Sequence, residues 1–371
     1  MNFELDSARL KSKARELHFD LCGIAAAGRP PRLARLADWI DRGYAGGMAY
    51  LDRSRGERLD PAKVLPGVRS VISLGVIYNT PHPYSTAAEE DGGAAIARYA
   101  WGADYHDVVR ARLRPFVRWL ADTAGEGFEA FSCVDSGPIQ ERVWAEQAGL
   151  GWIGKNTCLI NPALGSWLFL AEILTNAALD PDEPGVDQCG TCTRCLEACP
   201  TGALTEPYVL DATRCLSYLT IESRGPVDEG LRPFVGQQVY GCDICQDVCP
   251  WNRRAATSDD PAWQPREGLA FPRLVDLCER SDEAWRALLK GSAMRRAGLG
   301  RIRRSLAYAA AHLDEPAKTA ALDALASHAS GRAPDVVEAI AWARVDESSK
   351  FEVQSSNGTG LKDSGPRTED C

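Results

Sequence analysis

Long hydrophobic runs are missing from this sequence of 371 residues. A membrane-spanning helix needs about twenty consecutive apolar residues, and no run of roughly eighteen or more occurs. The first residues, Met-Asn-Phe-Glu-Leu-Asp-Ser, also lack the basic start and apolar core of a secretory signal peptide. We therefore expect a cytoplasmic protein without a membrane span, whose 13 cysteines are free thiols rather than disulfides.

An excess of positive charge is missing as well. The chain has 42 Lys and Arg residues against 51 Asp and Glu residues, which gives a formal net charge of −9. Proteins that bind nucleic acid without sequence preference usually carry the opposite balance over much of their surface. Any contact with nucleic acid must therefore come from a local basic cluster.

Cysteine is abundant by contrast, and eight of the 13 cysteines lie between residues 189 and 250. The first run contains Cys189, Cys192, Cys195 and Cys199, and the second contains Cys242, Cys245 and Cys249. A proline follows the last cysteine of each run. Thiolates two residues apart can bind one 4Fe-4S cluster, while the cysteine before the proline ligates the other cluster of a two-cluster ferredoxin. The spacing predicts two such clusters.

The second run lacks its first cysteine, because Val239 stands at that position. Cys215 is the only other cysteine between the runs, so we expect it to supply the missing thiolate. One cluster would be held by Cys189, Cys192, Cys195 and Cys249, and the other by Cys199, Cys215, Cys242 and Cys245. Structural zinc sites also use Cys-x-x-Cys pairs, and two zinc ions would use the same eight residues. The long run that ends in proline favours iron–sulfur clusters.

The remaining sequence predicts an α+β protein in four parts. Residues 1–184 should form a mixed α/β domain, residues 185–260 a bacterial-ferredoxin-like domain with two clusters, and residues 261–347 a helical, HEAT-like domain. Residues 348–371 are polar with few apolar residues and should be disordered.

Apolar periodicity predicts individual elements. Helices are expected at residues 6–18, 31–41, 104–121 and 139–148. Strands are expected at residues 68–77 and 128–134, and a hairpin from residues 157–160 and 166–174. Helices at residues 210–221 and 231–239 would separate the cysteine runs in sequence and bring them together in space.

Two adjacent clusters move single electrons, which requires little more than the cysteine segment itself. The roughly 185 residues before that segment are enough for a domain of their own. We therefore expect this domain to contain a substrate or cofactor site to which the clusters deliver electrons.

Several motifs outside the cysteine spacing point to a family. They are residues 67–75 (Gly-Val-Arg-Ser-Val-Ile-Ser-Leu-Gly), 98–106, 134–142, 148–156 (Ala-Gly-Leu-Gly-Trp-Ile-Gly-Lys-Asn), 165–167, 218–222 (Tyr-Leu-Thr-Ile-Glu) and 240–252. Together they resemble the epoxyqueuosine reductases, over about residues 5 to 345. Members of that family use cobalamin and two 4Fe-4S clusters to reduce epoxyqueuosine, at the wobble position of tRNA, to queuosine.

The resemblance implies an oxidoreductase. We expect it to act as a monomer and to receive electrons from a soluble low-potential donor. Its first domain would bind cobalamin and have a nitroreductase/reductive-dehalogenase-like fold. Asp135 would be the proton donor, and burial beside the corrin ring would raise its pKa. Arg142 would stabilise a carboxylate, a phosphate or a developing oxyanion. From the residues alone, Asp135 equally suits an N-cap for the helix near Ile139, and Arg142 a surface salt bridge.

The resemblance also implies cobalamin contacts. They are Arg58, Asp135, Lys155, Asn156, Leu159, Ser166 and Thr220. A cobalamin ligated by a protein histidine usually has an Asp-x-His-x-x-Gly motif, and residues 104–109 lack the glycine. We therefore expect base-off cobalamin with no histidine on the metal, and we interpret His106 as a structural residue beside a helix start.

The local basic cluster that RNA binding requires lies near the end of the chain. Five arginines fall within ten residues: Arg295, Arg296, Arg301, Arg303 and Arg304. They would contact phosphates of the tRNA anticodon loop, whose single-stranded bases can be extruded into an active site. An arginine run of this kind is otherwise usually a solvated helix face.

Two other functions would also account for the cysteine runs. A cobalamin-dependent reductive dehalogenase shares paired clusters, but it usually carries a twin-arginine export signal, which this sequence lacks. A noncatalytic iron–sulfur electron-transfer protein would have no cobalamin and no requirement for Asp135.

Overall fold

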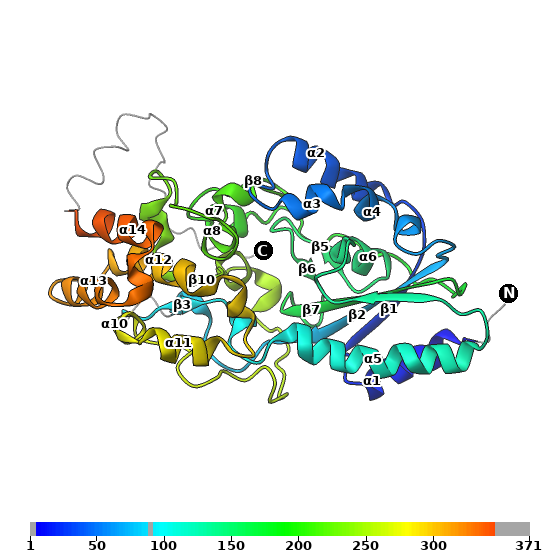
Figure 1. Ribbon diagram of the computed structural model, residues 1–371. Coiled ribbons are helices and arrows are strands. Elements are labelled where there is room, and N and C mark those ends of the chain that lie inside the picture. Colours follow the sequence, from blue (N-terminus) through cyan, green and yellow to red (C-terminus); the bar gives the residue numbers. More distant parts are fainter. Residues whose placement is uncertain (1–4, 88–91, 346–371) are drawn as a thin grey trace.

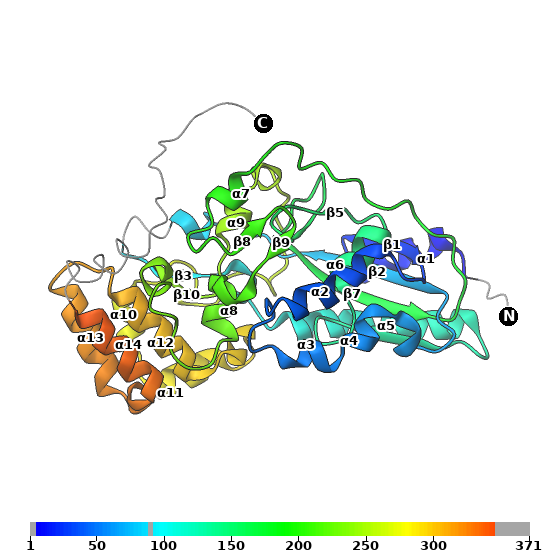
Figure 2. The same cartoon turned by 90° about the horizontal axis from the view of Figure 1, so that it is seen from above.

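The structure is a computed structural model that describes residues 5–87 and 92–345. The predicted disordered tail, residues 348–371, lies outside the described residues. A sheet with its covering helices forms one end of the molecule, and the C-terminal helices form the other (Figure 1). Seen from above, the cysteine segment lies between these two ends (Figure 2). Over the two described ranges, no helix is both long and apolar enough to cross a membrane.

A four-stranded antiparallel sheet is the centre of the first half of the chain. Its strands in spatial order are β1 (Leu21–Ala26), β2 (Ser70–Ile77), β7 (Leu168–Thr175) and β4 (Ala130–Cys133). Alternate side chains point to opposite faces of a strand. Ile72 and Leu74 therefore join the core on one face, whereas Val71 and Leu174 join the core on the other.

Helices cover both faces of this sheet. They are α1 (Ser7–Glu16), α2 (Arg35–Asp41), α3 (Ala49–Arg53), α4 (Arg55–Leu59), α5 (Tyr105–Ala124) and α6 (Glu141–Gln147). Figure 1 shows α1 and α5 on one side of the sheet and α6 on the other. The predicted helices in this half of the chain, and the predicted strands that became β2 and β4, are confirmed.

Helix α5 shows why apolar periodicity predicts the helices in this half of the chain. The Asp104 side chain accepts a hydrogen bond from the backbone N–H of His106, which caps the first turn. Val109, Leu113 and Phe116 then fall on one stripe and are buried against the sheet. The helix therefore presents its first turn, and not its apolar stripe, to the loops at the end of the sheet.

The predicted hairpin of residues 157–160 and 166–174 is wrong. Strand β6 (Leu159–Ile160) pairs with β5 (Trp152–Ile153), while β7 pairs with β2 and β4 in the central sheet. The turn between them closes locally, because Asn161 and Gly165 form an isolated antiparallel bridge and the Asn161 side chain accepts hydrogen bonds from the backbone N–H groups of Ala163 and Leu164. The pairing does not extend beyond this bridge, because β2 and β4 pair with β7 on its two edges.

The cysteine segment consists of short elements. They are α7 (Arg194–Glu197), β8 (Leu204–Glu206), β9 (Val209–Leu210), α8 (Leu216–Ile221), β10 (Gln238–Tyr240) and α9 (Ile244–Asp247). Helices α7 and α9, one from each cysteine run, pack against each other. The helix predicted at residues 231–239 is wrong, because a 3-10 turn at Arg232–Val235 leads into β10. The helix predicted at residues 210–221 is limited to α8 and a preceding 3-10 turn.

Strand β10 joins the cysteine segment to the first part of the chain. It pairs in parallel with β3 (Ala95–Ile96), which precedes α5. Ile96 and Trp101 are buried in one apolar cluster with Val239 of β10 and with residues of the C-terminal helices. The three predicted domains therefore share a core at this point.

The C-terminal part is helical, as predicted. It contains α10 (Leu274–Glu279), α11 (Asp282–Leu289), α12 (Gly298–Ala310), α13 (Ala317–Ser327) and α14 (Pro334–Arg344). Helix α12 contacts each of the other four and is buried from Ile302 to Ala310. The overall architecture is thus mixed α/β with a helical end, and the HEAT-like assignment stays a prediction.

Candidate redox and catalytic site

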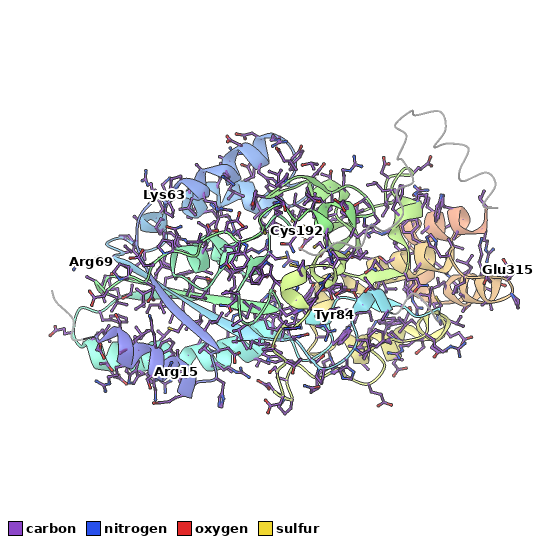
Figure 3. The ribbon with its side chains drawn as sticks, turned by 180° about the vertical axis from the view of Figure 1, so that it is seen from behind. Arg15, Lys63, Arg69, Tyr84, Cys192 and Glu315 are labelled. Carbon is purple, nitrogen blue, oxygen red and sulfur yellow. The ribbon has the colours of Figure 1, made fainter. Side chains whose placement is uncertain are left out.

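The eight cysteines of the two runs gather in two groups. Cys189, Cys192, Cys195 and Cys249 line one cavity of about 420 Å³, here called the first cluster cavity. Cys199, Cys215, Cys242 and Cys245 line a cavity of about 300 Å³, the second cluster cavity. These are the two groups that the spacing predicts. From behind, Cys192 lies between the sheet and the C-terminal helices (Figure 3).

The surroundings of the first cluster cavity suit an anionic iron–sulfur cluster. Lys155 lines the cavity, and its ammonium group donates to the carbonyl oxygens of Gly190 (2.6 Å) and Cys192 (2.9 Å). The indole N–H of Trp152 points at the Cys189 sulfur, at 3.5 Å. Positive charge and N–H donors beside cysteine sulfurs tune cluster potentials. Four thiols with these neighbours therefore fit a 4Fe-4S cluster.

Asn156 lies between the two cavities and lines both. Its amide group donates to the carbonyl oxygen of Cys245 at 3.3 Å, and its carbonyl oxygen accepts from the backbone N–H of Cys158 at 3.1 Å. Asn156, predicted as a cobalamin contact, is thus placed beside the thiols of both cysteine groups.

Two other predicted cobalamin contacts and one predicted catalytic residue line the second cluster cavity. Leu159, Ser166 and the catalytic candidate Arg142 share it with the second cysteine group. The Ser166 hydroxyl donates to the side-chain oxygen of Gln246 at 2.9 Å, and the guanidinium of Arg142 donates to the carbonyl oxygen of Thr157 at 3.0 Å. Arg142 thus has a backbone partner rather than the surface salt bridge considered from the sequence.

Thr220 and Arg58 have other partners. The Thr220 hydroxyl is buried, donates to the carbonyl oxygen of Leu216 at 2.8 Å and accepts from the backbone N–H of Gly241 at 2.9 Å. Arg58 donates to the carbonyl oxygen of Ile139 at 2.9 Å, so it holds the end of the loop after β4. The side chain of Thr220 is therefore committed to the protein, whereas Arg58 lies beside the loop that carries Asp135.

Asp135 lies in that loop, directly after β4. Its φ of 57° is in the left-handed region, which Asp adopts more readily than most residues. Its carboxylate is about half exposed, at 51%, and accepts from the hydroxyl of Tyr105 at 3.0 Å. His106 Nε2 lies 3.2 Å from the same oxygen. The first turn of α5 therefore supplies both side-chain partners of Asp135.

Asp135 does not cap the following helix. Helix α6 begins at Glu141, and the side chain of its N-cap residue, Gln140, makes no capping hydrogen bond. The Glu141 carboxylate instead accepts the backbone N–H of Asp135. This geometry removes the N-cap alternative, and the half-exposed Asp135 carboxylate instead forms hydrogen bonds with Tyr105 and His106.

The charges of Asp135 and His106 are linked. Burial acts to raise the pKa of Asp135, but the hydrogen bonds from His106 and Tyr105 prevail and lower it. Burial likewise acts to lower the pKa of His106, but Asp135 and Asp104 raise it on balance. Both shifts favour a carboxylate on Asp135 beside a protonated imidazole on His106, and the lowered pKa of Asp135 is opposite to the raised pKa that we expected.

Sequence reasoning missed this role of His106. Its Nδ1 lies 2.8 Å from the Asp104 carboxylate, so it is indeed a residue of the helix start, as interpreted above. Its other nitrogen faces Asp135, which lies 29 positions further along the chain. This contact forms only when α5 packs against the sheet, so no pattern in the residues around His106 indicates it.

A third cavity, of about 230 Å³, adjoins this pair. It is lined by Asp104, His106, Asp107, Arg110, Ala293, Arg295 and Arg296 and is here called the arginine cavity. Arg296 forms an ion pair with Glu222, and its guanidinium carbon lies 5.7 Å from the ring centroid of Tyr50. Two of the five predicted RNA-contacting arginines therefore lie beside His106.

Arg303 and Arg304 require a correction. Both are fully buried on α12. Arg303 donates to the carbonyl oxygens of Cys278 and Arg280 and pairs with Asp282, and Arg304 donates to carbonyl oxygens at residues 219, 223 and 225. These guanidinium groups bind backbone within the protein, since burial of a charge requires such partners. They cannot reach an RNA phosphate while the helix is folded, so only Arg295, Arg296 and Arg301 stay candidates.

Comparisons with known proteins match most of the chain to epoxyqueuosine reductases. Residues 58–136 match the family model described as "Epoxyqueuosine reductase QueG, DUF1730", and residues 188–252 match the model of a 4Fe-4S double cluster binding domain. The chain is 44% identical over 309 residues to an epoxyqueuosine reductase of Gloeobacter violaceus, covering 81% of this chain and 94% of that protein. It is 41% identical over 348 residues to one of Pseudomonas aeruginosa, covering 91% and 94%.

The chain also resembles solved structures of epoxyqueuosine reductases. A crystal structure of epoxyqueuosine reductase with a tRNA-Tyr epoxyqueuosine-modified stem loop has a TM-score of 0.80 at 30% identity, covering 95% of this chain and 94% of that one. An epoxyqueuosine reductase from Bacillus subtilis, with its catalytic Asp loop swung out of the active site, has a TM-score of 0.73 at 29% identity, covering 94% and 96%.

Proposed function

The chain belongs to the epoxyqueuosine reductase family, and on this premise we propose that it reduces epoxyqueuosine in tRNA to queuosine. Loss of the epoxide oxygen as water needs two electrons and protons for the departing oxygen. The cysteine segment, which matches the 4Fe-4S double cluster family, supplies a route for the electrons, and the Asp135–His106 pair supplies a proton.

The position of Asp135 carries this proposal. Its donor Tyr105 packs edge-on against Tyr99, with ring centroids 6.1 Å apart, and Tyr99 lines the second cluster cavity. Its other partner, His106, lines the arginine cavity. Asp135 therefore lies between the end of the electron route and the cavity that would receive an anionic substrate. In the Bacillus subtilis enzyme a catalytic Asp loop can swing out, and we propose that residues 135–138 are its counterpart.

We propose cobalamin as the group between the clusters and the substrate. Arg142, Leu159 and Ser166 would hold it, because they line the second cluster cavity together with cysteine thiols. When bound, cobalamin supplies a metal centre that accepts electrons singly and acts on carbon, while the protein supplies position and protons. His106 would not ligate it, since both ring nitrogens already face carboxylates. Base-off binding stays part of the proposal.

The residues that line the two cavities support a proposed order of electron transfer. Arg142, Leu159 and Ser166 line the cavity of the second cysteine group, whereas Lys155 lines that of the first and Asn156 lines both. Electrons would pass from a soluble low-potential donor to the first cluster, then to the second cluster and to the cofactor. We further propose that the protein acts as a cytoplasmic monomer.

The proton would come from His106 through Asp135. His106 holds a proton because its pKa is raised, and its Nε2 lies 3.2 Å from the Asp135 carboxylate. When the epoxide oxygen approaches Asp135, the proton crosses this hydrogen bond to the carboxylate and then to oxygen. Such general acid catalysis commonly contributes about 10²–10⁴-fold to a rate.

This arrangement predicts a pH dependence. Because the pKa of His106 is raised, the imidazolium persists above the range of a free histidine, and kcat should fall as pH rises through that pKa. In His106→Gln this proton source is lost, and so are the hydrogen bond and charge of His106 that lower the pKa of Asp135, so the falling limb should no longer lie at its wild-type pH. The measurement is kcat against pH with reduced enzyme and saturating stem loop. A limb at the same pH in both proteins would exclude His106 as the proton source.

For the RNA, we propose contacts from Arg295, Arg296 and Arg301. Arg295 is exposed and lines the arginine cavity, which supports a contact with a phosphate. Arg295→Ala should raise KM for the stem loop, leave kcat unchanged and reduce the salt dependence of binding by about one phosphate contact. Arg344→Ala removes an exposed arginine on α14 and is the matched control. Equal KM values for wild type and Arg295→Ala at several salt concentrations would contradict this contact.

One experiment tests the whole proposal. The protein is purified anaerobically, its iron, sulfide and cobalt are quantified, and nucleosides are analysed by mass spectrometry after incubation with epoxyqueuosine tRNA. Conversion to queuosine with cobalt present supports the proposal. Absence of cobalt and of conversion would favour an electron-transfer protein, and dehalogenation of an aryl halide without tRNA conversion would favour a dehalogenase.

A further inference from the structure

A buried cluster of acidic and thiol side chains lies behind the loop that carries Asp135. It consists of Cys133 on β4, Glu141 on α6 and Glu172 on β7. The sulfur and one carboxylate oxygen from each acid all lie within 4.8 Å of one another. Cys133 and Glu172 are register partners on adjacent strands, so their side chains point to the same face, which α6 covers.

Glu172 has an unusual environment for an acid. Its side chain is 0% exposed, on the strand between β2 and β4. Within residues 5–87 and 92–345, no donor reaches either of its carboxylate oxygens. A buried carboxylate without a donor or a cation is strongly disfavoured, and such a group binds a proton instead.

The two acids have different roles. Glu141 already accepts the backbone N–H of Asp135, so it serves as the acceptor. Burial first, and then the neighbouring charge of Glu141, raise the pKa of Glu172 well above its usual range. Burial and the charge of Asp135 raise the pKa of Glu141 only to about 7. A proton shared by the pair therefore resides mainly on Glu172, with Glu141 as the partner that accepts it.

We propose that Glu172 is a neutral carboxylic acid that donates its O–H to Glu141, and that this bond holds Glu141 where it fixes the amide of Asp135. Both acids are positioning residues for the proposed proton donor, so this inference rests on the proposed function. No proton is consumed, because the one on Glu172 stays within the pair.

The backbone explains why such a support is needed. Asp135 has a left-handed φ, which costs free energy in a residue other than glycine and persists only when its surroundings fix it. Two residues later, a Cβ on Gly137 would lie 2.6 Å from the Cys133 sulfur, so the loop passes directly over the buried cluster. A change in the Glu141–Glu172 bond would therefore move the loop and displace the Asp135 carboxylate from His106.

A divalent cation such as Zn²⁺ is the rival occupant, because one thiol and two carboxylates are possible ligands. One oxygen of Glu141 is committed to the Asp135 amide, which favours the proton over the metal. Metal analysis of the variants below decides between them.

The test uses three variants of the full-length holoenzyme. Glu172→Gln keeps the shape and a neutral donor, so kcat should stay within about twofold of wild type. Glu172→Leu removes the donor, and kcat should fall on the order of tenfold with unchanged KM and cluster content. Ser73→Ala is the matched control, because Ser73 is the buried register partner of Glu172 on β2 and should not affect kcat.

A spectroscopic measurement is independent of turnover and of the leucine variant. At neutral pH the wild-type infrared spectrum should contain the carbonyl stretch of a protonated carboxylic acid, which Glu172→Gln removes and Ser73→Ala retains. The proposal is overturned if that band is absent from wild type, if Glu172→Gln is as slow as Glu172→Leu, or if either variant loses a stoichiometric Zn²⁺. A failure of the proposed function, such as an active Asp135→Asn enzyme, would leave the band unchanged and is therefore distinguishable.

Discussion

Replacement of Asp135 by Asn is expected to reduce turnover of epoxyqueuosine tRNA by roughly 10²–10⁴-fold, which is the usual contribution of a general acid. Asn keeps the shape of the side chain and, like Asp, tolerates the left-handed φ of 57° at this position. The hydrogen bond from Tyr105 can still form, but the amide cannot deliver a proton. The measurement is single-turnover conversion of the stem loop by pre-reduced enzyme.

The control for this variant is Asp107→Asn. Asp107 also lines the arginine cavity and lies in the first turn of α5, so it changes the same local charge without touching the proton route. Iron, sulfide and cobalt contents should match wild type in both variants. Normal conversion by Asp135→Asn, with all metals present, would exclude Asp135 as the proton donor.

Replacement of Cys215 by Ser is expected to remove about half of the iron and sulfide and to abolish turnover, because one of two equal clusters loses a ligand. Cys215 lines the second cluster cavity with Cys199, Cys242 and Cys245. Loss of this cluster interrupts the proposed route next to the cofactor. Iron and sulfide analysis and the low-temperature paramagnetic resonance spectrum of the reduced protein measure the effect.

Two further variants sharpen this test. Cys22→Ser changes a thiol on β1, outside both cysteine groups, and should keep all iron. Val239→Cys, added to Cys215→Ser, restores the cysteine that a regular ferredoxin run would have. Val239 is buried in β10 within the apolar cluster, so the double variant should not regain iron. Full iron content in Cys215→Ser would mean that another residue ligates the second cluster.

The parts that depend on local spacing were predictable from the sequence. The two cysteine groups follow from the intervals between cysteines, and α5 follows from its apolar stripe. Strand β1 was missed because its sequence, Leu-Cys-Gly-Ile-Ala-Ala, contains a glycine and small residues. A Cβ on Gly23 would lie 2.0 Å from the carbonyl oxygen of Ala148, so this glycine is required by the close approach of the end of α6.

The parts that depend on tertiary contacts were not predictable. Five clustered arginines look alike in sequence, but Arg303 and Arg304 are buried by carbonyl oxygens from distant segments, whereas Arg295 is exposed. The contacts of Asp135 also depend on tertiary packing, because His106 and Tyr105 reach it only when α5 packs against the sheet. The lowered pKa of Asp135 follows from that contact and has no signal in the residues around it.

The pairing of β3 with β10 determines how far this enzyme can be divided. In the part of the chain that the structure describes, residues 95–96 form their strand with residues 238–240, and both are buried among side chains of the C-terminal helices. A fragment that ends before the cysteines would leave β3 without its partner and expose Trp101 to water. Electron-transfer and catalytic halves produced as separate chains should therefore be insoluble alone and regain solubility only when they are expressed together.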